Sequence, residues 1–144
     1  MKKIFVILML FGGLILSCNS TKPVVDAAGD KPVLKENDTV RIADAESEFE
    51  LIILDPAFNG WFNMNARPRN FYSQSYLEAR NRTWVVEWNN RAIQPSRFGG
   101  IYDLPINYYS TTDYGFEVNY MLFNYLTYFQ LKYNQRLGGF PARI

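Results

Sequence analysis

Histidine is absent from the 144 residues of this chain, and cysteine occurs only once. These two shortages exclude a Ser-His-Asp triad, a zinc site built from His and Cys, an internal disulfide and a CxxC redox pair. The sequence also contains neither a glycine-rich phosphate loop nor a calcium-loop pattern. We therefore expect a protein without a metal site and without a cofactor.

The chain also has almost no net charge, because it contains 15 Lys plus Arg and 14 Asp plus Glu. This balance opposes binding to nucleic acid, which depends on a strongly basic surface. The charges are nevertheless unevenly spread. Residues 18–60 hold four basic and nine acidic residues, whereas residues 61–144 hold nine basic and five acidic ones. An acidic segment therefore precedes a basic body, and the two are able to pack on each other.

The amino terminus has the pattern of a secretory signal peptide. Lys2 and Lys3 precede a run from Ile4 to Leu16 that is entirely apolar or Gly, and a polar stretch follows from Asn19. A membrane-spanning helix needs roughly 20 apolar residues, so this run is too short for a permanent span. Residues 1–17 are therefore predicted to be a signal peptide.

The end of this run, Leu14-Ile15-Leu16-Ser17-Cys18, resembles the lipobox of bacterial lipoproteins. The resemblance implies that the Cys18 sulfur takes a diacylglyceryl group and that its amine is acylated after cleavage, for example with palmitate. Two or three acyl chains anchor a protein firmly where one would bind only marginally. The alternative is a plain signal peptide in which Cys18 is an ordinary apolar residue near the cleavage site.

Residues 18–40 have the composition of a flexible tether. They are rich in Lys, Asp, Pro, Gly and Ala and contain no aromatic residue and no periodic apolar pattern. Within them, Asp38-Thr39-Val40 resembles the sequon that Bacteroidota use for periplasmic O-glycosylation, which makes Thr39 a candidate for modification. The alternative is a solvated linker threonine.

The body, residues 41–144, holds nearly all of the aromatic residues, which make up 17% of the chain and suffice for a core. Residues 48–54 alternate and then become continuously apolar, a pattern typical of a strand. The other segments are predicted as loops over residues 57–70 and 97–112 and helices over residues 76–93 and 113–137. The expected fold class is α+β: a small single domain with one strand or short hairpin and two long helices.

Both helices carry start and stop signals. Ser75 and Glu78 form a Ser-x-x-Glu capping box for the first, and Pro95 marks its end. Asp113 is a suitable N-cap for the second, with Gly138-Gly139 as its stop. One stripe of the first helix should face the core, and it consists of Leu77, Asn81, Trp84, Val85, Trp88 and Ala92.

Catalysis would have to rely on carboxylates, Lys, Tyr, Ser or Arg. The acids of the body that could pair are Glu78, Glu87, Asp103, Asp113 and Glu117. A glycosidase needs two carboxyl groups at a defined separation, and these five form no recognisable arrangement. Helix capping and i, i+4 pairing with Arg account for most of them. We therefore assign no catalytic residue.

Arginine and aromatic residues form the richest cluster. Its candidate binding residues are Arg67, Arg69, Arg80, Trp84, Glu87, Trp88, Arg91 and Arg97. Adjacent indole faces and guanidinium groups can stack sugars and bind carboxylates or phosphates by bidentate hydrogen bonds. The alternative, which we favour for a domain of this size, is that the two Trp fill the core while the Arg stems cover them.

Several strings of the body are distinctive, namely residues 67–78, Trp88-Asn89-Asn90-Arg91, Gln94-Pro95, residues 113–120, Tyr128-Phe129-Gln130 and Lys132-Tyr133-Asn134-Gln135. Together they resemble a family of short, uncharacterised Bacteroidota lipoproteins with a domain of unknown function, over roughly residues 39–137. The resemblance implies an envelope lipoprotein and transfers no catalytic residue. Because no acidic cluster follows Cys18, it favours the periplasmic leaflet of the outer membrane.

The function expected from the sequence is therefore a non-catalytic, lipid-anchored envelope protein. Its partners would be the membrane, through Cys18, and an envelope protein or a cell-wall glycan. The competing hypothesis is a carboxylate-dependent hydrolase of envelope glycans.

The lipid anchor makes a direct prediction. Changing Cys18 to Ala removes the thiol that carries the lipid, so the protein should leave the membrane fraction. Membrane fractionation followed by immunoblotting measures this. A Cys18→Ala protein that still sediments with membranes would contradict the lipoprotein assignment.

Overall fold

The computed structural model describes residues 40–43, 50–53 and 55–144. The predicted signal peptide, Cys18, Thr39 and nearly all of the predicted tether lie outside the described residues. The elements in chain order are β1 (Val40–Ala43), β2 (Glu50–Ile53), α1 (Pro56–Asn65), the 3-10 turn η1 (Arg69–Phe71), α2 (Gln74–Ala92), α3 (Pro95–Phe98) and α4 (Gly115–Lys132).

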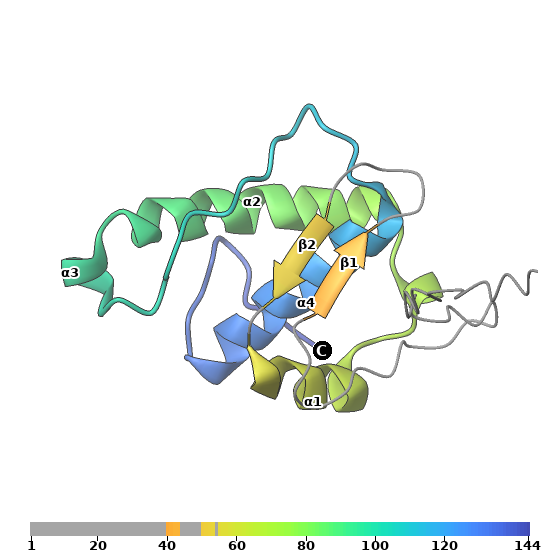
Figure 1. Ribbon diagram of the computed structural model, residues 1–144, viewed down its shortest axis with the longest axis horizontal. Helices are drawn as coiled ribbons and strands as arrows, with labels where there is room; N and C mark the ends of the chain where they lie inside the picture. The colour runs from red at the N-terminus through yellow and green to blue at the C-terminus, as the bar shows by residue number, and fades with distance from the viewer. Residues whose placement is uncertain (1–39, 44–49, 54) are drawn as a thin grey trace, which may run out of the picture.

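Helix α4 is the central element of the fold. Helices α1 and α2 pack on different sides of it, and the β1–β2 ribbon crosses another of its faces (Figure 1). The short helix α3 lies beyond the carboxyl end of α2, far from α1. The two other long helices, α1 and α2, and both strands therefore contact α4.

The expected α+β class is wrong, because the body of the protein is helical. In the described residues, strands occur only in β1 and β2, which pair antiparallel with Val40 opposite Ile53 and Ala43 opposite Glu50. Two strands of four residues form a ribbon rather than a layer, since a stable sheet generally needs three strands or more. The number of helices was also underestimated, because α1 lies in the predicted loop 57–70 and α3 begins at Pro95, which was predicted only to end a helix. The rest of the loop predicted over residues 97–112 is confirmed.

Helix α1 is the main element that the sequence analysis missed. Asp55 is its N-cap and accepts a hydrogen bond from the Ala57 amide at 3.0 Å, and Pro56 occupies the first turn. Asp55-Pro56 directly follows the predicted strand, and Gly60 within the segment is typical of a loop. Full burial of Phe58 and Phe62, one turn apart, offsets the roughly 1 kcal/mol that a mid-helix glycine costs.

Helix α2 matches its prediction except at the start. The N-cap is Ser73, whose hydroxyl accepts from the Tyr76 amide at 3.2 Å, so the predicted Ser75–Glu78 capping box is wrong. The predicted core stripe is confirmed, because five of its residues are buried and Ala92 packs partly buried against them. The five buried ones are Leu77, Asn81, Trp84, Val85 and Trp88.

Helix α4 is shorter than predicted at both ends. It begins at Gly115, whose amide donates to the Asp113 carboxylate at 3.0 Å, so Asp113 binds the first turn without being the N-cap itself. It ends at Lys132, and Asn134 with φ 50° turns the backbone away well before Gly138. Twelve of its residues are buried. Within the part of the chain that the structure describes, no helix is long and apolar enough to cross a membrane.

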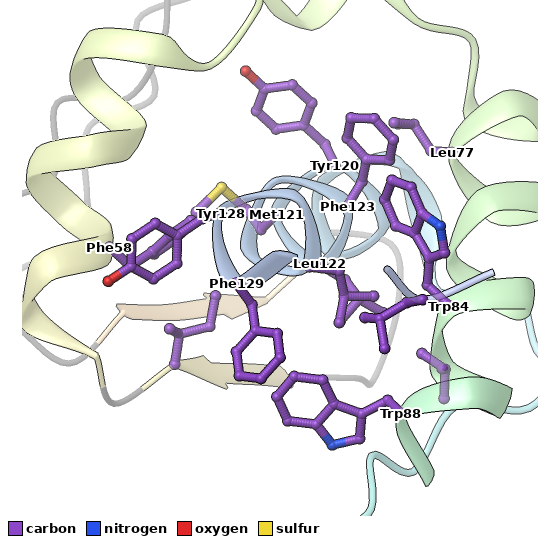
Figure 2. Close-up of a cluster of buried hydrophobic side chains, with 14 of the residues drawn as sticks. Phe58, Leu77, Trp84, Trp88, Tyr120, Met121, Leu122, Phe123, Tyr128 and Phe129 are labelled. Carbon is purple, nitrogen blue, oxygen red and sulfur yellow. The ribbon is translucent and has the colours of Figure 1, made fainter. Parts of the chain in front are cut away.

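Aromatic rings fill the space around α4 (Figure 2). Trp84 stacks on Phe123 with ring centroids 5.2 Å apart, and Trp88 packs on Phe129 at 4.4 Å. On the other side, Phe58 of α1 contacts Tyr128 at 5.5 Å. Both indoles are almost completely buried, so the two Trp residues belong to the core, as the favoured alternative expected.

Asp55 joins α1 to the far end of α4. Its Oδ2 accepts from Tyr128 Oη and from Lys132 Nζ, each at 3.0 Å. Partial burial acts to raise the pKa of Asp55, but the hydrogen bonds from Lys132 and Tyr128, the charge of Lys132 and the Ala57 amide lower it below its ordinary value of 3.8. The carboxylate form therefore stabilises the folded state.

This contact predicts a pH-dependent stability. Because the pKa of Asp55 is lower in the folded state, its contribution is present near neutral pH and is lost as the pH falls through the folded pKa. Asp55→Asn keeps a capping side chain but removes the charge, so it should lower the free energy of unfolding by about 1 kcal/mol at pH 7. The difference from wild type should shrink as the pH falls and should vanish at an acid pH at which the folded-state Asp55 carboxyl is protonated.

Urea unfolding of wild type and Asp55→Asn at pH 7 and at the acid pH measures this effect. Asp103→Asn serves as the control. This substitution removes the same charge from a different, exposed position. An Asp55→Asn deficit that persists unchanged at low pH would contradict the ionic contribution of Asp55.

Candidate functional site

A pocket in the described residues lies between the start of α2 and the carboxyl-terminal segment. Its volume is about 300 Å³, at the lower end of the range for small-molecule sites. We call it the arginine–aromatic pocket. It is lined by Arg67, Phe71, Tyr72, Tyr76, Arg80, Trp84, Phe123, Phe140, Pro141, Arg143 and Ile144.

Arg80 is held between two aromatic rings. Its guanidinium carbon lies 5.2 Å from the centre of the Tyr76 ring and 4.7 Å from that of the Phe140 ring. Cation–π contacts occupy the faces of the guanidinium group, whereas its N–H bonds point outward in the plane of the group. Arg80 forms no ion pair or hydrogen bond with the described residues. Its donors are therefore available to an acceptor that enters the pocket.

Two further arginines give the pocket a positive charge. Arg67 lies over the Phe71 ring at 5.3 Å and donates to the Ile144 carbonyl oxygen at 3.2 Å. Arg143 is exposed and lines the same space. The lining contains no acidic side chain, and the one hydrogen-bond acceptor that these guanidinium groups have among the lining residues is the Ile144 main-chain oxygen on Arg67. An anion is therefore the natural complement of the pocket.

The structure distributes the predicted binding residues over several places. Arg67, Arg80 and Trp84 come together in the arginine–aromatic pocket, with Trp84 forming part of its buried floor. The other five of the predicted set do not line it, and these are Arg69, Glu87, Trp88, Arg91 and Arg97. The eight predicted residues therefore do not form the single surface that the helix periodicity suggested.

Arg69 and Arg97 have separate environments. Arg69 forms a bidentate ion pair with Glu117, with Nε–Oε1 and Nη2–Oε2 distances of 2.5 and 2.6 Å, which ties η1 to the first turn of α4. Arg97 is exposed on α3, where its guanidinium carbon lies 5.2 Å from the centre of the Phe98 ring. Neither residue contributes a donor to the pocket.

Arg91 forms a structural hub at the opposite end of α2. It pairs with Glu87 at 2.7 Å, and its Nη1 donates to the Tyr102 hydroxyl at 2.8 Å and to Gln135 Oε1 at 3.2 Å. Nη2 donates to the Arg136 carbonyl at 2.6 Å. The guanidinium group therefore joins α2 to two loops, and its donors are used within the protein.

The acidic residues considered for catalysis are mostly bound by neighbouring groups. Glu78 accepts from Gln74 at 2.9 Å and from Arg82 at 3.2 Å, and Asp113 accepts from Gln74 and the Gly115 amide, each at 3.0 Å. Glu87 and Glu117 pair with Arg91 and Arg69, and Asp103 is exposed. Among the described residues there is also no group of three or more Cys, Asp or Glu that could hold a metal ion.

Four of the eleven residues that line the pocket lie in a segment that was not singled out in the sequence analysis. Phe140, Pro141, Arg143 and Ile144 belong to the segment after α4, for which no function was predicted. The segment is positioned by long-range contacts, including the Leu137 amide donating to Gln130 Oε1 at 2.8 Å. Gly138 also approaches α2 closely, since a Cβ there would lie 3.1 Å from the Thr83 methyl group. Helical periodicity gives no signal for such contacts.

The environments of Arg91 and Arg80 predict different effects on stability. Arg91→Ala leaves several internal acceptors unpaired and should lower the free energy of unfolding by about 2–4 kcal/mol. Arg80→Ala removes only ring contacts and should lower it by no more than about 1 kcal/mol. Urea unfolding of the two variants tests this difference, and equal losses would contradict the distinction between a structural and an available arginine.

The chain was compared with curated proteins, with solved structures and with families of related sequences. No curated protein matches it, and no solved structure does. A family match, by contrast, extends over residues 4–142, which is nearly the whole sequence and includes the amino-terminal run and all of the pocket lining except Arg143 and Ile144. The chain therefore belongs to DUF6146, a family of unknown function.

Proposed function

We propose that this protein is a non-catalytic, lipid-anchored module of a Bacteroidota cell envelope. In this role it binds an envelope protein or a cell-wall glycan through the arginine–aromatic pocket. The observation that carries the proposal is the combination, in one pocket, of an available Arg80 guanidinium group with exposed aromatic rings and no acidic side chain in the lining. Such a surface binds anionic groups that carry an apolar or planar part.

The amino-terminal sequence supports the proposed location. The charged start, the short apolar run and the lipobox-like Leu14–Cys18 segment together are typical of exported lipoproteins. The absence of an acidic cluster after Cys18 favours the periplasmic face of the outer membrane. O-glycosylation of Thr39 stays a prediction, and it would fit the same envelope location.

The distribution of charge supports binding rather than hydrolysis. Hydrolysis of a glycan by two carboxylates requires both groups to face the substrate. Four of the five candidate acids form ion pairs or hydrogen bonds, and none of the five lines the pocket. The side chains that do line the pocket are arginines and aromatic residues, which suit recognition of a ligand better than hydrolysis by paired carboxylates.

The proposed partner site can be tested in cells. Arg80→Gln removes the available guanidinium group at little cost in stability, so it should reduce crosslinking of the protein to its envelope partner about tenfold. Arg97→Gln is the matched control, because Arg97 also stacks on a ring but lies on α3, away from the pocket. Crosslinking in intact cells followed by mass spectrometry measures both variants.

The outcome is informative in either direction. Loss of crosslinks in Arg80→Gln alone supports the pocket as the partner site. Equal crosslinking by wild type, Arg80→Gln and Arg97→Gln would contradict it.

A further inference from the structure

Two of the three pocket arginines keep all of their guanidinium donors available. Arg67 donates to the Ile144 carbonyl oxygen at 3.2 Å, so one of its N–H groups is used inside the protein. Arg80 and Arg143 line the same pocket and form no ion pair or hydrogen bond with the described residues. The available donors therefore come from both elements that form the pocket, α2 and the carboxyl-terminal segment.

The inner aromatic rings of the pocket are used in contacts within the protein. Tyr72 stacks on Tyr76 with ring centroids 5.0 Å apart, and the Arg80 guanidinium carbon lies 5.2 Å from the centre of the Tyr76 ring. Phe123 packs on Tyr72 at 5.0 Å and stacks on Trp84 at 5.2 Å. These rings leave no flat platform for the sugar ring of a glycan. Of the two partners under the proposed function, the pocket therefore fits a protein better.

The outer aromatic rings, by contrast, offer apolar surface at the mouth of the pocket. Phe71 and Phe140 are 59% and 62% exposed, and the lining residues Tyr76 and Ile144 are exposed as well. Single exposed apolar residues are ordinary, whereas a group of them around one pocket is typical of an interaction surface. The mouth can therefore take up apolar side chains of a partner.

The carboxyl-terminal segment also offers main-chain groups. Residues 139–144 form no helix or strand, and none of their amides donates a hydrogen bond within the described part of the chain. Only two of their carbonyl groups accept one, at Gly139 and Ile144. Exposed main chain of this kind can pair with an extended peptide, which supplies matching carbonyl and amide groups. This wall of the pocket therefore favours a partner with a peptide backbone.

Arg80 is placed to give such an interaction its specificity. The rings of Tyr76 and Phe140, on either side, restrict the guanidinium group before any partner arrives. A guanidinium group held in this way binds a carboxylate through two parallel hydrogen bonds and loses little side-chain entropy. The apolar rings also limit the access of water to the ion pair, so the pair is stronger than one on an open surface.

We propose that the arginine–aromatic pocket binds an extended, acidic peptide segment of an envelope protein. A carboxylate of the peptide binds Arg80, apolar side chains next to it pack on Phe71 and Phe140, and its main chain follows residues 139–144. The inference rests on the proposed function and names the chemistry of the partner at the same pocket. A lining with three arginines and no acidic side chain is complementary in charge to such a peptide.

A membrane surface is the competing partner for a cationic site with exposed aromatic residues. Anionic headgroups attract arginine, and aromatic side chains favour the headgroup region of a bilayer. The available guanidinium group of Arg80 nevertheless lies in a pocket of about 300 Å³, which a side chain can enter and the plane of a bilayer cannot follow. Binding to vesicles is therefore an outcome that the experiments below have to separate from peptide binding.

Isothermal titration of the purified full chain with three peptides tests the proposed partner chemistry. The first, acetyl-Gly-Phe-Glu-Phe-Gly-amide, carries a carboxylate between two phenyl groups. The second has Gln in place of Glu, and the third has Ser in place of both Phe. We expect the first peptide to bind at least about tenfold more tightly than either of the others, since only it occupies both parts of the site. Equal affinity of the first peptide and either of the others, or no binding of any, would overturn the proposal.

The role of Arg80 is tested with a matched pair of variants. Arg80→Gln should weaken binding of the Glu peptide about tenfold and leave the weak binding of the Gln peptide unchanged. Arg97→Gln removes the same charge from a ring-stacked arginine on α3 and should bind as wild type does. Equal weakening by both variants would show general attraction of an anion and would overturn the assignment to Arg80.

The role of the mouth is tested with two equally exposed aromatic residues. Phe140 is 62% exposed and lines the pocket, whereas Tyr109 is 63% exposed and does not. Phe140→Ser should lower the affinity for the Glu peptide severalfold, and Tyr109→Ser should leave it unchanged, with both melting temperatures close to that of wild type. Affinity that falls in both variants or in neither, or that falls together with the melting temperature, would overturn the assignment to Phe140.

Amide hydrogen exchange tests the main-chain contact. The amides of Phe140, Ala142, Arg143 and Ile144 have no partner in the described residues, so the Glu peptide should slow their exchange at saturation. Exchange rates that the bound peptide leaves unchanged would overturn the pairing of the peptide with this segment.

The results also distinguish failure of this inference from failure of the proposed function. Crosslinks in cells that depend on Arg80, without binding of any peptide, would overturn the acidic peptide and leave the pocket as a partner site of other chemistry. Binding to phosphatidylglycerol vesicles that depends on Arg80, again without peptide binding, would assign the pocket to the membrane surface and overturn the inference. Absence of crosslinks, peptide binding and vesicle binding would overturn the proposed function together with the inference.

Discussion

Burial of α4 on all its sides is the constraint on which the rest of the structure depends. Twelve residues of this helix are buried, and they include large side chains directed toward α1, α2 and the ribbon (Figure 2). A helix that is apolar around its whole circumference must be covered by the remainder of the chain. Each neighbouring element therefore supplies aromatic or aliphatic side chains to a shared core.

Hydrogen bonds from polar side chains of α4 determine which segment lies where. Asn119 binds Asn81 of α2 and the Tyr108 hydroxyl, and the Tyr120 hydroxyl donates to the Arg67 carbonyl ahead of α2. Tyr128 binds Asp55 at the start of α1, and Gln130 accepts from Leu137 in the carboxyl-terminal segment. Apolar contacts are not directional, so these few bonds give the core one arrangement rather than several. They also explain why Asn and Gln side chains lie in such an apolar helix.

The arginine–aromatic pocket follows from this arrangement. The segment after α4 returns along the start of α2 and leaves a space in which Arg80 lies between a ring of α2 and a ring of that segment. Arg91, about three turns further along α2, is surrounded instead by Glu87, Tyr102 and Gln135. The same residue type on the same helix therefore has a structural role at one end and an open contact surface at the other.

The sequence by itself determined the position of α2 and its buried stripe and the helical nature of residues 115–132, whereas its signal peptide and lipobox stay predictions. These features rest on local composition, capping residues and a 3.6-residue period, all of which a single segment carries. Helix α1 and the true N-cap of α2 were missed because Asn, Gly and Ser signals for loops and for helix starts overlap. Only the tertiary structure decided which arginines are available, since Arg67, Arg80 and Arg91 differ in the distant residues that meet them. That choice depends on the return of the carboxyl-terminal segment, which is held by contacts between residues far apart in the chain.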